Sequence, residues 1–187
     1  MEDYLPIVVA GEVDAGKSTL IGSFLHEMGA VPESLDSNFD FAYLLDSLEE
    51  ERKGSLTIDT TQVFCKNKKG RGFLFIDVPG QRELLKNALC GSSYAQAAIL
   101  VIDILKPVQD GTRRHIDILK FLGIEKVLAV LNKADLVDFS RNAFRDAQAK
   151  ISGFFAEQSF PCLNSLNNPG QTACQSWAGA GPEHIRL

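Results

Sequence analysis

A glycine-rich segment near the N-terminus lies between a short apolar run and a helical pattern, and it reads Gly11-Glu12-Val13-Asp14-Ala15-Gly16-Lys17-Ser18. The run before it, at 5–10, has the length and residue types of a buried strand, and apolar residues after Ser18 return every three or four positions. Glycines let such a segment curl so that successive backbone N–H groups point to one place, and the N-terminus of the following helix adds partial positive charge. The pattern G-x-x-x-x-G-K-[ST] between a strand and a helix therefore predicts a loop that binds phosphate groups.

Short apolar runs alternate with helical patterns along the rest of the chain. Further strands are predicted at 61–65, 73–76, 97–102, 127–131 and 160–163, and further helices at 114–122 and 141–155. The runs at 97–102 and 127–131 are apolar throughout, which favours strands covered on both faces. The polar segment at 66–72 predicts a hairpin turn. We therefore predict an α/β fold with a mostly parallel sheet and helices on both faces.

Length and composition fit a single domain over residues 1–187. The chain has 19 Lys and Arg against 24 Asp and Glu, and its formal net charge of −5 gives no reason to expect direct nucleic-acid or membrane binding. Apolar residues make up 45%, which excludes a disordered chain, and no run approaches the roughly 20 apolar residues of a membrane helix. The four cysteines lack metal-binding spacing, so we expect reduced thiols in a cytoplasmic protein.

Two segments depart from the alternation. Residues 29–54 form a long connection with a helical pattern at 41–52, and connections of this length in compact domains are usually functional. Residues 166–187 are poor in charge and rich in Asn, Gly and Gln, which predicts an irregular C-terminal segment. We therefore expect the closing C-terminal helix of the fold to be short or missing.

A second motif, Asp77-Val78-Pro79-Gly80-Gln81, follows the predicted strand at 73–76. A carboxylate at the end of such a strand can hold Mg²⁺ through a water, and the hydroxyl of Ser18 is a further candidate ligand. Gly80 lets its backbone N–H approach a terminal phosphate closely, and Gln81 lies where an attacking water must be oriented. Gln81 is therefore a candidate catalytic residue, together with Lys17, which would reach the β- and γ-phosphates.

A third motif, Asn132-Lys133-Ala134-Asp135, follows the predicted strand at 127–131, at the edge of an α/β sheet where ligands bind. The Asp135 carboxylate can accept two hydrogen bonds from the N1–H and N2–H₂ groups of guanine. Adenine offers no donors at that edge and would leave the carboxylate unpaired, which is a strong basis for discrimination. Asp135 therefore predicts a preference for GTP over ATP.

These three motifs, in this order, resemble the signature of GTPases of the Ras-like superfamily, and their details resemble its translation-factor branch. Glu12-Val13-Asp14 is similar to the G-[HS]-V-D loop of that branch, and Arg52-Lys53-Gly54-Ser55-Leu56-Thr57-Ile58 is similar to its R-x-x-G-I-T-I segment. Within the branch, the chain most resembles the GTPase subunit of sulfate adenylyltransferase. The segments that carry this likeness are 16–22, 45–48, 112–115 and 134–139.

The resemblance implies a P-loop NTPase fold of the G-domain type that binds GTP or GDP with Mg²⁺. Residues 29–58 would then be switch I, the effector region, and residues 77–92 switch II. Asp14 would help to hold a monovalent cation, and Ser165 with Leu166 would match the fifth base-contacting loop. The expected contacts to GTP are Asp14, Ala15, Gly16, Lys17, Ser18, Thr19, Gly80, Asn132, Lys133, Asp135, Ser165 and Leu166. The expected magnesium ligands are Ser18, Thr57 and Asp77, and Thr57 would also contact the γ-phosphate and act in catalysis.

Two departures from the family pattern affect the expected activity: Gln81 stands where translation-type GTPases carry His, and Ser55-Leu56 replaces the usual Gly-Ile pair. Three functions stay open. The first is a GTP-hydrolysing switch that drives adenylyl transfer to sulfate in a catalytic partner subunit. The second is a nucleotide-dependent binding module with negligible turnover, and the third is a GTPase that acts on the ribosome. We rank them in this order, because the sequence shows neither RNA-binding β-barrel domains nor an excess of basic residues.

Several other polar residues have weaker claims to a function. Arg113 and Arg114 are expected on the exposed face of a helix, with an arginine finger supplied in cis as the alternative. His26, His115 and His184 are too scattered for a metal site, and each is expected to pack at the surface or in the core.

Overall fold

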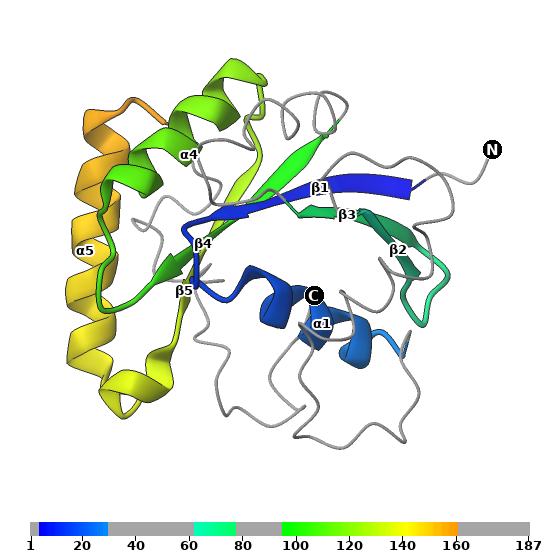
Figure 1. Ribbon diagram of the computed structural model, residues 1–187, viewed down its shortest axis with the longest axis horizontal. Coiled ribbons are helices and arrows are strands. Elements are labelled where there is room, and N and C mark those ends of the chain that lie inside the picture. The colour runs from blue at the N-terminus through cyan, green and yellow to red at the C-terminus, as the bar shows by residue number, and fades with distance from the viewer. Residues whose placement is uncertain (1–3, 30–61, 78–94, 161–187) are drawn as a thin grey trace.

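Runs of β-branched and aromatic residues form the strands of one sheet in the computed structural model, which describes residues 4–29, 62–77 and 95–160. The described strands are β1 (Tyr4–Gly11), β2 (Gln62–Lys66), β3 (Gly72–Asp77), β4 (Ala97–Asp103) and β5 (Val127–Asn132). Their order in the sheet is β2-β3-β1-β4-β5 (Figure 1). β1 pairs in parallel with β3 and β4, and β4 pairs in parallel with β5, so the predicted mostly parallel sheet is confirmed.

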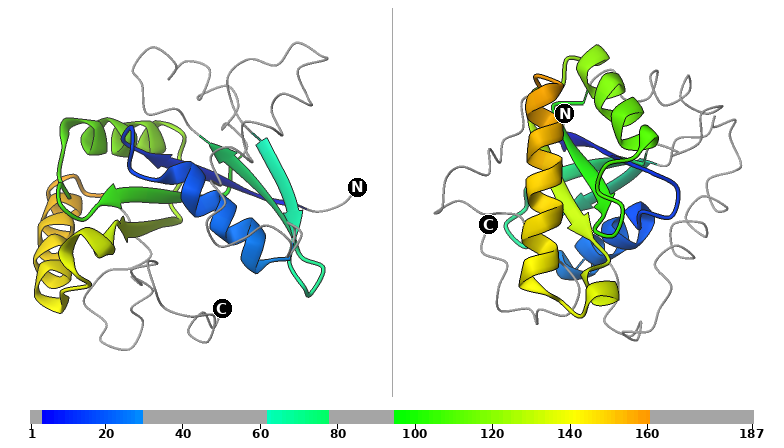
Figure 2. Two further views of the ribbon diagram at one scale, coloured as in Figure 1. Left: turned by 60° about the horizontal axis from the view of Figure 1, so that its bottom comes forward. Right: turned by 90° about the vertical axis from the view of Figure 1, so that its left-hand side faces the viewer.

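Successive strand side chains point to opposite faces of this sheet and build a separate apolar core on each. In β4, for example, Leu100 packs in one core and Val101 in the other. Helices α4 (Asp110–Phe121) and α5 (Arg141–Glu157) cover the first core, and α1 (Lys17–Glu27) covers the second (Figures 1 and 2). The expected α/β architecture with helices on both faces is therefore confirmed.

β2 and β3 form the antiparallel hairpin that the polar turn predicts. The side-chain oxygen of Asn67 accepts hydrogen bonds from the backbone N–H groups of Lys69 and Arg71, both at 3.0 Å. Gly70 follows with φ of 78°, a left-handed conformation that glycine adopts without steric cost. The hairpin adds β2 to the edge of the sheet. Because β3 pairs in parallel with β1, the carboxyl ends of these two strands lie side by side.

Helix α4 begins at Asp110, four residues before the predicted start at residue 114. The cause is a capping interaction, in which the backbone N–H of Gln109 donates to the Thr112 hydroxyl at 3.3 Å. The helix ends before Gly123, whose φ of 68° confirms the predicted glycine stop. A short 3₁₀ helix, η2 (Ala134–Val137), follows β5 and was not predicted.

Other expectations fall on residues that the structure does not describe: the helix at 41–52, most of the strand at 160–163, both switch regions and the C-terminal segment with its closing helix. Cys65 is a buried free thiol, and burial raises its pKa to about 11, so it is a core residue with little thiolate at neutral pH. In the described part of the chain, no helix is long and apolar enough to cross a membrane.

Candidate functional site

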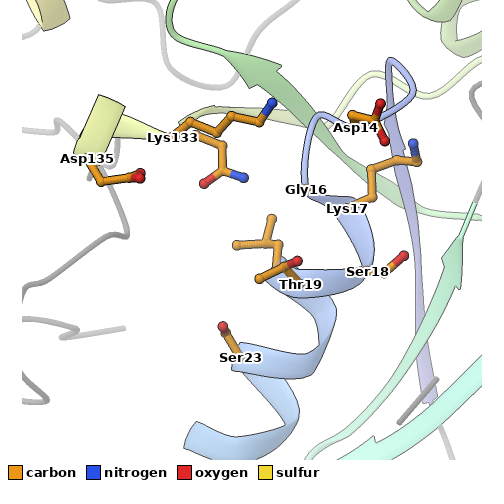
Figure 3. A pocket seen from close by; sticks show the side chains of 10 residues that line it. Asp14, Gly16, Lys17, Ser18, Thr19, Ser23, Lys133 and Asp135 are labelled. Atoms are coloured by element: carbon orange, nitrogen blue, oxygen red, sulfur yellow. The ribbon is translucent and has the colours of Figure 1, made fainter. Parts of the chain in front are cut away.

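The loops that follow β1 and β5 meet at one edge of the sheet and enclose a pocket, with the end of β3 beside them. Parallel strands place their carboxyl ends at the same edge, which is where α/β folds bind ligands. The pocket has a volume of about 570 Å³, within the range that small-molecule sites occupy. Its lining residues are Asp14, Gly16, Lys17, Ser18, Thr19, Leu20, Ser23, Asn132, Lys133 and Asp135 (Figure 3). Nine of the predicted contacts to GTP lie in the described part of the chain, and eight of them line this one pocket, all except Ala15.

The loop between β1 and α1 has the curled backbone that its glycines predict. Asp14 has φ of 61° and Gly16 has φ of 91°, so two of its residues adopt left-handed conformations. A side chain at Gly16 would also overlap the side-chain amide of Asn132. That amide donates a hydrogen bond to the Ala15 carbonyl at 2.8 Å, so Asn132 from β5 fixes the loop across the pocket.

Lys17 lies inside the curl of this loop. Its ammonium group donates to the carbonyl oxygens of Gly11, at 3.1 Å, and Glu12, at 2.9 Å. Burial lowers the pKa of Lys17 below its usual value, and the nearby carboxylates, Asp77 first among them, oppose that shift. A partly desolvated cation at this position favours binding of an anionic group such as a phosphate.

The first helical turn of α1 meets the end of β3 at a hydroxyl and a carboxylate. The Ser18 hydroxyl lies 3.4 Å from Oδ2 of Asp77 and donates to it. Mg²⁺ prefers hard oxygen ligands and is usually held by one or two protein groups together with phosphate oxygens and water. Ser18 and Asp77 fit that requirement, and when bound the ion would neutralise phosphate charge.

The opposite end of the pocket is formed by the turn after β5. Lys133 has a left-handed backbone with φ of 63°, and its ammonium group pairs with Asp103 at the end of β4 at 2.8 Å. Burial would raise the pKa of Asp103, but the hydrogen bonds from Lys133 and from the Leu105 backbone lower it below its ordinary value. Asp135 is exposed in η2, so its carboxylate is free to accept hydrogen bonds from a ligand.

Five predicted site residues lie outside the described part of the chain: Thr57, Gly80, Gln81, Ser165 and Leu166. Their roles stay predictions, as does the monovalent cation near Asp14. The structure also adds Ser23 and Asp103, which sequence reasoning missed. Asp103 could have been found, because it ends a buried strand at the same edge, whereas Ser23 looks like an ordinary helix residue.

Arg113 and Arg114 differ in their surroundings. Arg113 is exposed, and its guanidinium lies 5.0 Å from the centre of the Phe154 ring. Arg114 is partly exposed and contacts Glu12 in the phosphate loop. The expectation of an exposed helix face is therefore confirmed for Arg113 and is incomplete for Arg114.

His115 packs in the core beneath the phosphate loop, with a relative exposure of 2%. Its pKa is lowered to about 4, chiefly by burial and also by charge repulsion from Lys17 and Arg114, while a hydrogen bond with the Gly11 backbone acts in the opposite direction. Within the described structure, Nδ1 of its imidazole has no hydrogen-bond partner. His115 is therefore held neutral at physiological pH.

This pKa predicts a loss of stability in acid. Between pH 6.5 and about 4 the unfolded chain binds a proton at His115 that the folded chain does not, so stability falls as the pH is lowered through that range. The expected contribution is about 3 kcal/mol at the acid end. Urea unfolding from pH 7 to pH 4 should therefore show a smaller pH dependence for His115→Phe than for the wild type. His26→Asn, at an exposed histidine, should follow the wild-type profile, and identical profiles for all three proteins would contradict the prediction.

In this mostly parallel sheet, the loop after β1 curls around a lysine and the turn after β5 offers a carboxylate across the same pocket. This arrangement defines the class of P-loop GTP-binding domains. Residues 2–175 match the family model of the elongation factor Tu GTP-binding domain. The chain belongs to this family. The expected translation-factor-type G domain is thereby confirmed.

Individual relatives agree with this family. Elongation factor 1-alpha of Archaeoglobus fulgidus is 34% identical over 163 residues, which are 81% of this chain and 38% of the relative. Elongation factor 1-alpha of Pyrococcus furiosus is 34% identical over 158 residues, which are 79% of this chain and 37% of the relative. The crystal structure of the bacterial selenocysteine-specific elongation factor EF-Sec matches with a TM-score of 0.61 and 27% identity, over 86% of this chain and 25% of that one. The chain thus spans about two fifths of the curated relatives that it matches.

These comparisons change the ranking of the sequence-based functions. The relatives named above are elongation factors, and none of them supports the narrower likeness to the GTPase subunit of sulfate adenylyltransferase. That likeness was carried by short segments, and two of them, 16–22 and 134–139, lie in or beside the nucleotide site. Motifs that bind the nucleotide report the shared ligand and are weak evidence for a particular partner.

Proposed function

We propose that this chain is the nucleotide-binding part of a translation-type GTPase, which binds Mg²⁺–GTP and hydrolyses it to GDP and phosphate as a conformational switch. The observation that carries the proposal is the pocket itself. Lys17 and Ser18 line it from the start of α1 and Asp135 lines it from η2, while Asp77 contacts Ser18 from the end of β3. Groups for phosphate, Mg²⁺ and guanine therefore meet at one edge of one sheet.

The expected mechanism is in-line attack of a water on the γ-phosphate. Lys17 and the backbone N–H groups of the loop would stabilise the charge that develops on the phosphate oxygens. Ser18 would hold Mg²⁺ directly, and Asp77 would hold it through a water. Gln81 would orient the attacking water, as its place after the D-x-P-G motif implies.

Replacing Gln81 by alanine is expected to slow phosphate release from GTP by roughly 10- to 100-fold, because an attacking water that is badly placed reacts slowly. GTP affinity should stay within about twofold of the wild type, since Gln81 acts on the water. Phosphate release from GTP and from ATP, each with the wild type and the variant, is the measurement. Gln96→Ala is a matched control, because Gln96 is exposed and precedes β4 at the opposite edge of the sheet.

Three other results would each change the proposal. GTP binding without phosphate release by the wild type would favour the binding module with negligible turnover. Equal use of ATP would contradict the role of Asp135. Unchanged release by Gln81→Ala would mean that another group positions the water.

The cellular role of the switch has two candidates. A role in translation is favoured, because the relatives are elongation factors. A role in sulfate activation, with an adenylyltransferase catalytic subunit as partner, is supported only by the sequence segments that resemble that subunit. GTP hydrolysis by the natural protein that is stimulated by ribosomes, and not by such a catalytic subunit, would support the first role.

A further inference from the structure

The phosphate loop is joined to helix α4 by an ion pair that neither the motifs nor the family assignment explains. Nη2 of Arg114 lies 3.7 Å from Oε1 of Glu12, the second residue of the loop. The two side chains are 33% and 22% exposed, so water screens the pair only in part. The pair connects two segments that lie about a hundred residues apart in the sequence.

Gly111 gives the Glu12 side chain the space that it occupies. A Cβ atom at position 111 would overlap the Glu12 carboxylate, which supplies the three nearest atoms outside the helix. Gly111 lies in the first turn of α4 without a left-handed backbone, so its conformation does not require glycine. Glycine is a poor helix former, and close packing with Glu12 is the physical reason for its presence here.

Glu12 in turn supports the residues that face the nucleotide. Its backbone carbonyl accepts from the Lys17 ammonium group at 2.9 Å and from the Ala15 N–H at 3.2 Å. A shift of Glu12 would therefore move both the lysine and the turn of the loop. The next residue of α4, His115, holds the Gly11 backbone, so α4 holds both of the first two residues of the loop.

We propose that Arg114 is a positioning residue, which acts through Glu12 to keep the phosphate loop in its nucleotide-binding conformation and thereby slows the release of GDP. The proposal rests on the proposed function, because it assumes that GDP occupies the pocket. Arg114 does not line the pocket, so its effect passes through the ion pair. Arg113 provides a matched control, since it precedes Arg114 and packs on Phe154.

The first experiment is a double-mutant cycle on the rate at which a fluorescent GDP analogue dissociates in the presence of Mg²⁺. Glu12→Gln and Arg114→Gln should each speed release by about two- to fivefold, the size expected for a partly exposed ion pair. The double variant should release GDP no faster than the faster single variant, and Arg113→Gln should match the wild type. Unchanged rates in the single variants, or rates that multiply in the double variant, would overturn the proposal. Failure of the wild type to bind GDP would instead count against the proposed function.

A second experiment separates positioning from stability. Gly111→Ala should displace the Glu12 carboxylate and speed GDP release by a similar factor, while alanine favours the helix and keeps the melting temperature of the nucleotide-free protein the same or higher. In a Glu12→Ala background, the same change should have no effect on release. A purely structural defect would lower the melting temperature and speed GDP release together. A Gly111→Ala variant that has a lower melting temperature without faster GDP release would therefore contradict the proposal. An equal effect of Gly111→Ala with and without Glu12 would contradict it as well.

Discussion

Replacing Lys17 by alanine is expected to weaken the binding of GTP and GDP by roughly 200- to 1000-fold, or about 3 to 4 kcal/mol. The ammonium group is held between the carbonyls of Gly11 and Glu12, so it is already positioned before the ligand arrives. Hydrogen bonds from a cation to phosphate are the strong class, and partial burial of Lys17 reduces their screening by water. Titration with a fluorescent GDP analogue measures the loss directly.

The control for this experiment is Lys68→Ala, which removes an exposed lysine from the β2–β3 turn. It should bind GDP like the wild type, because that turn lies outside the pocket lining. Melting temperatures of the two nucleotide-free variants should be compared as well. A Lys17→Ala protein that folds and binds GDP within threefold of the wild type would mean that the loop does not bind phosphate in the proposed way.

Replacing Asp135 by asparagine is expected to weaken GTP binding by about 100-fold or more and to create affinity for xanthosine triphosphate. Asparagine puts an NH₂ donor in place of one carboxylate oxygen, so one of the two hydrogen bonds from guanine is lost and that guanine donor is left facing another donor, at a combined cost of about 3 kcal/mol. Asparagine keeps an oxygen that can accept from N1–H of the base, and its NH₂ group can donate to the carbonyl that xanthine carries at C2. Competition of both triphosphates for the same site measures the exchange of specificity.

Asp138→Asn is the matched control for Asp135, since it makes the same chemical change three residues further on. Asp138 is exposed, follows η2 and does not line the pocket. Its left-handed backbone, with φ of 49°, also tolerates asparagine. Asp138→Asn should keep the preference for GTP, and a loss of specificity in both variants would show that the turn itself was disturbed.

Much of the described fold could be predicted because strand and helix patterns are local. The uninterrupted apolar runs of β4 and β5 required cover on both faces, and the two separate cores provide it. The errors have local causes too. The start of α4 was placed four residues late because its cap is formed by Gln109 and Thr112, a pair that is not among the strong capping signals.

The sequence by itself was enough to predict a phosphate loop, a metal-binding carboxylate and a guanine-recognition motif, because each is a short segment whose chemistry depends on residue type and spacing. Only the tertiary structure decided how these segments support one another. The Asn132 amide reaches the Ala15 carbonyl across 117 positions of sequence, and Ser18 reaches Asp77 across 59. Arg114 reaches Glu12 in the same way, with space that Gly111 leaves free. The physical reason is that a parallel sheet brings the carboxyl ends of its strands to one edge, while the packing of the helices on that sheet decides which side chains meet there.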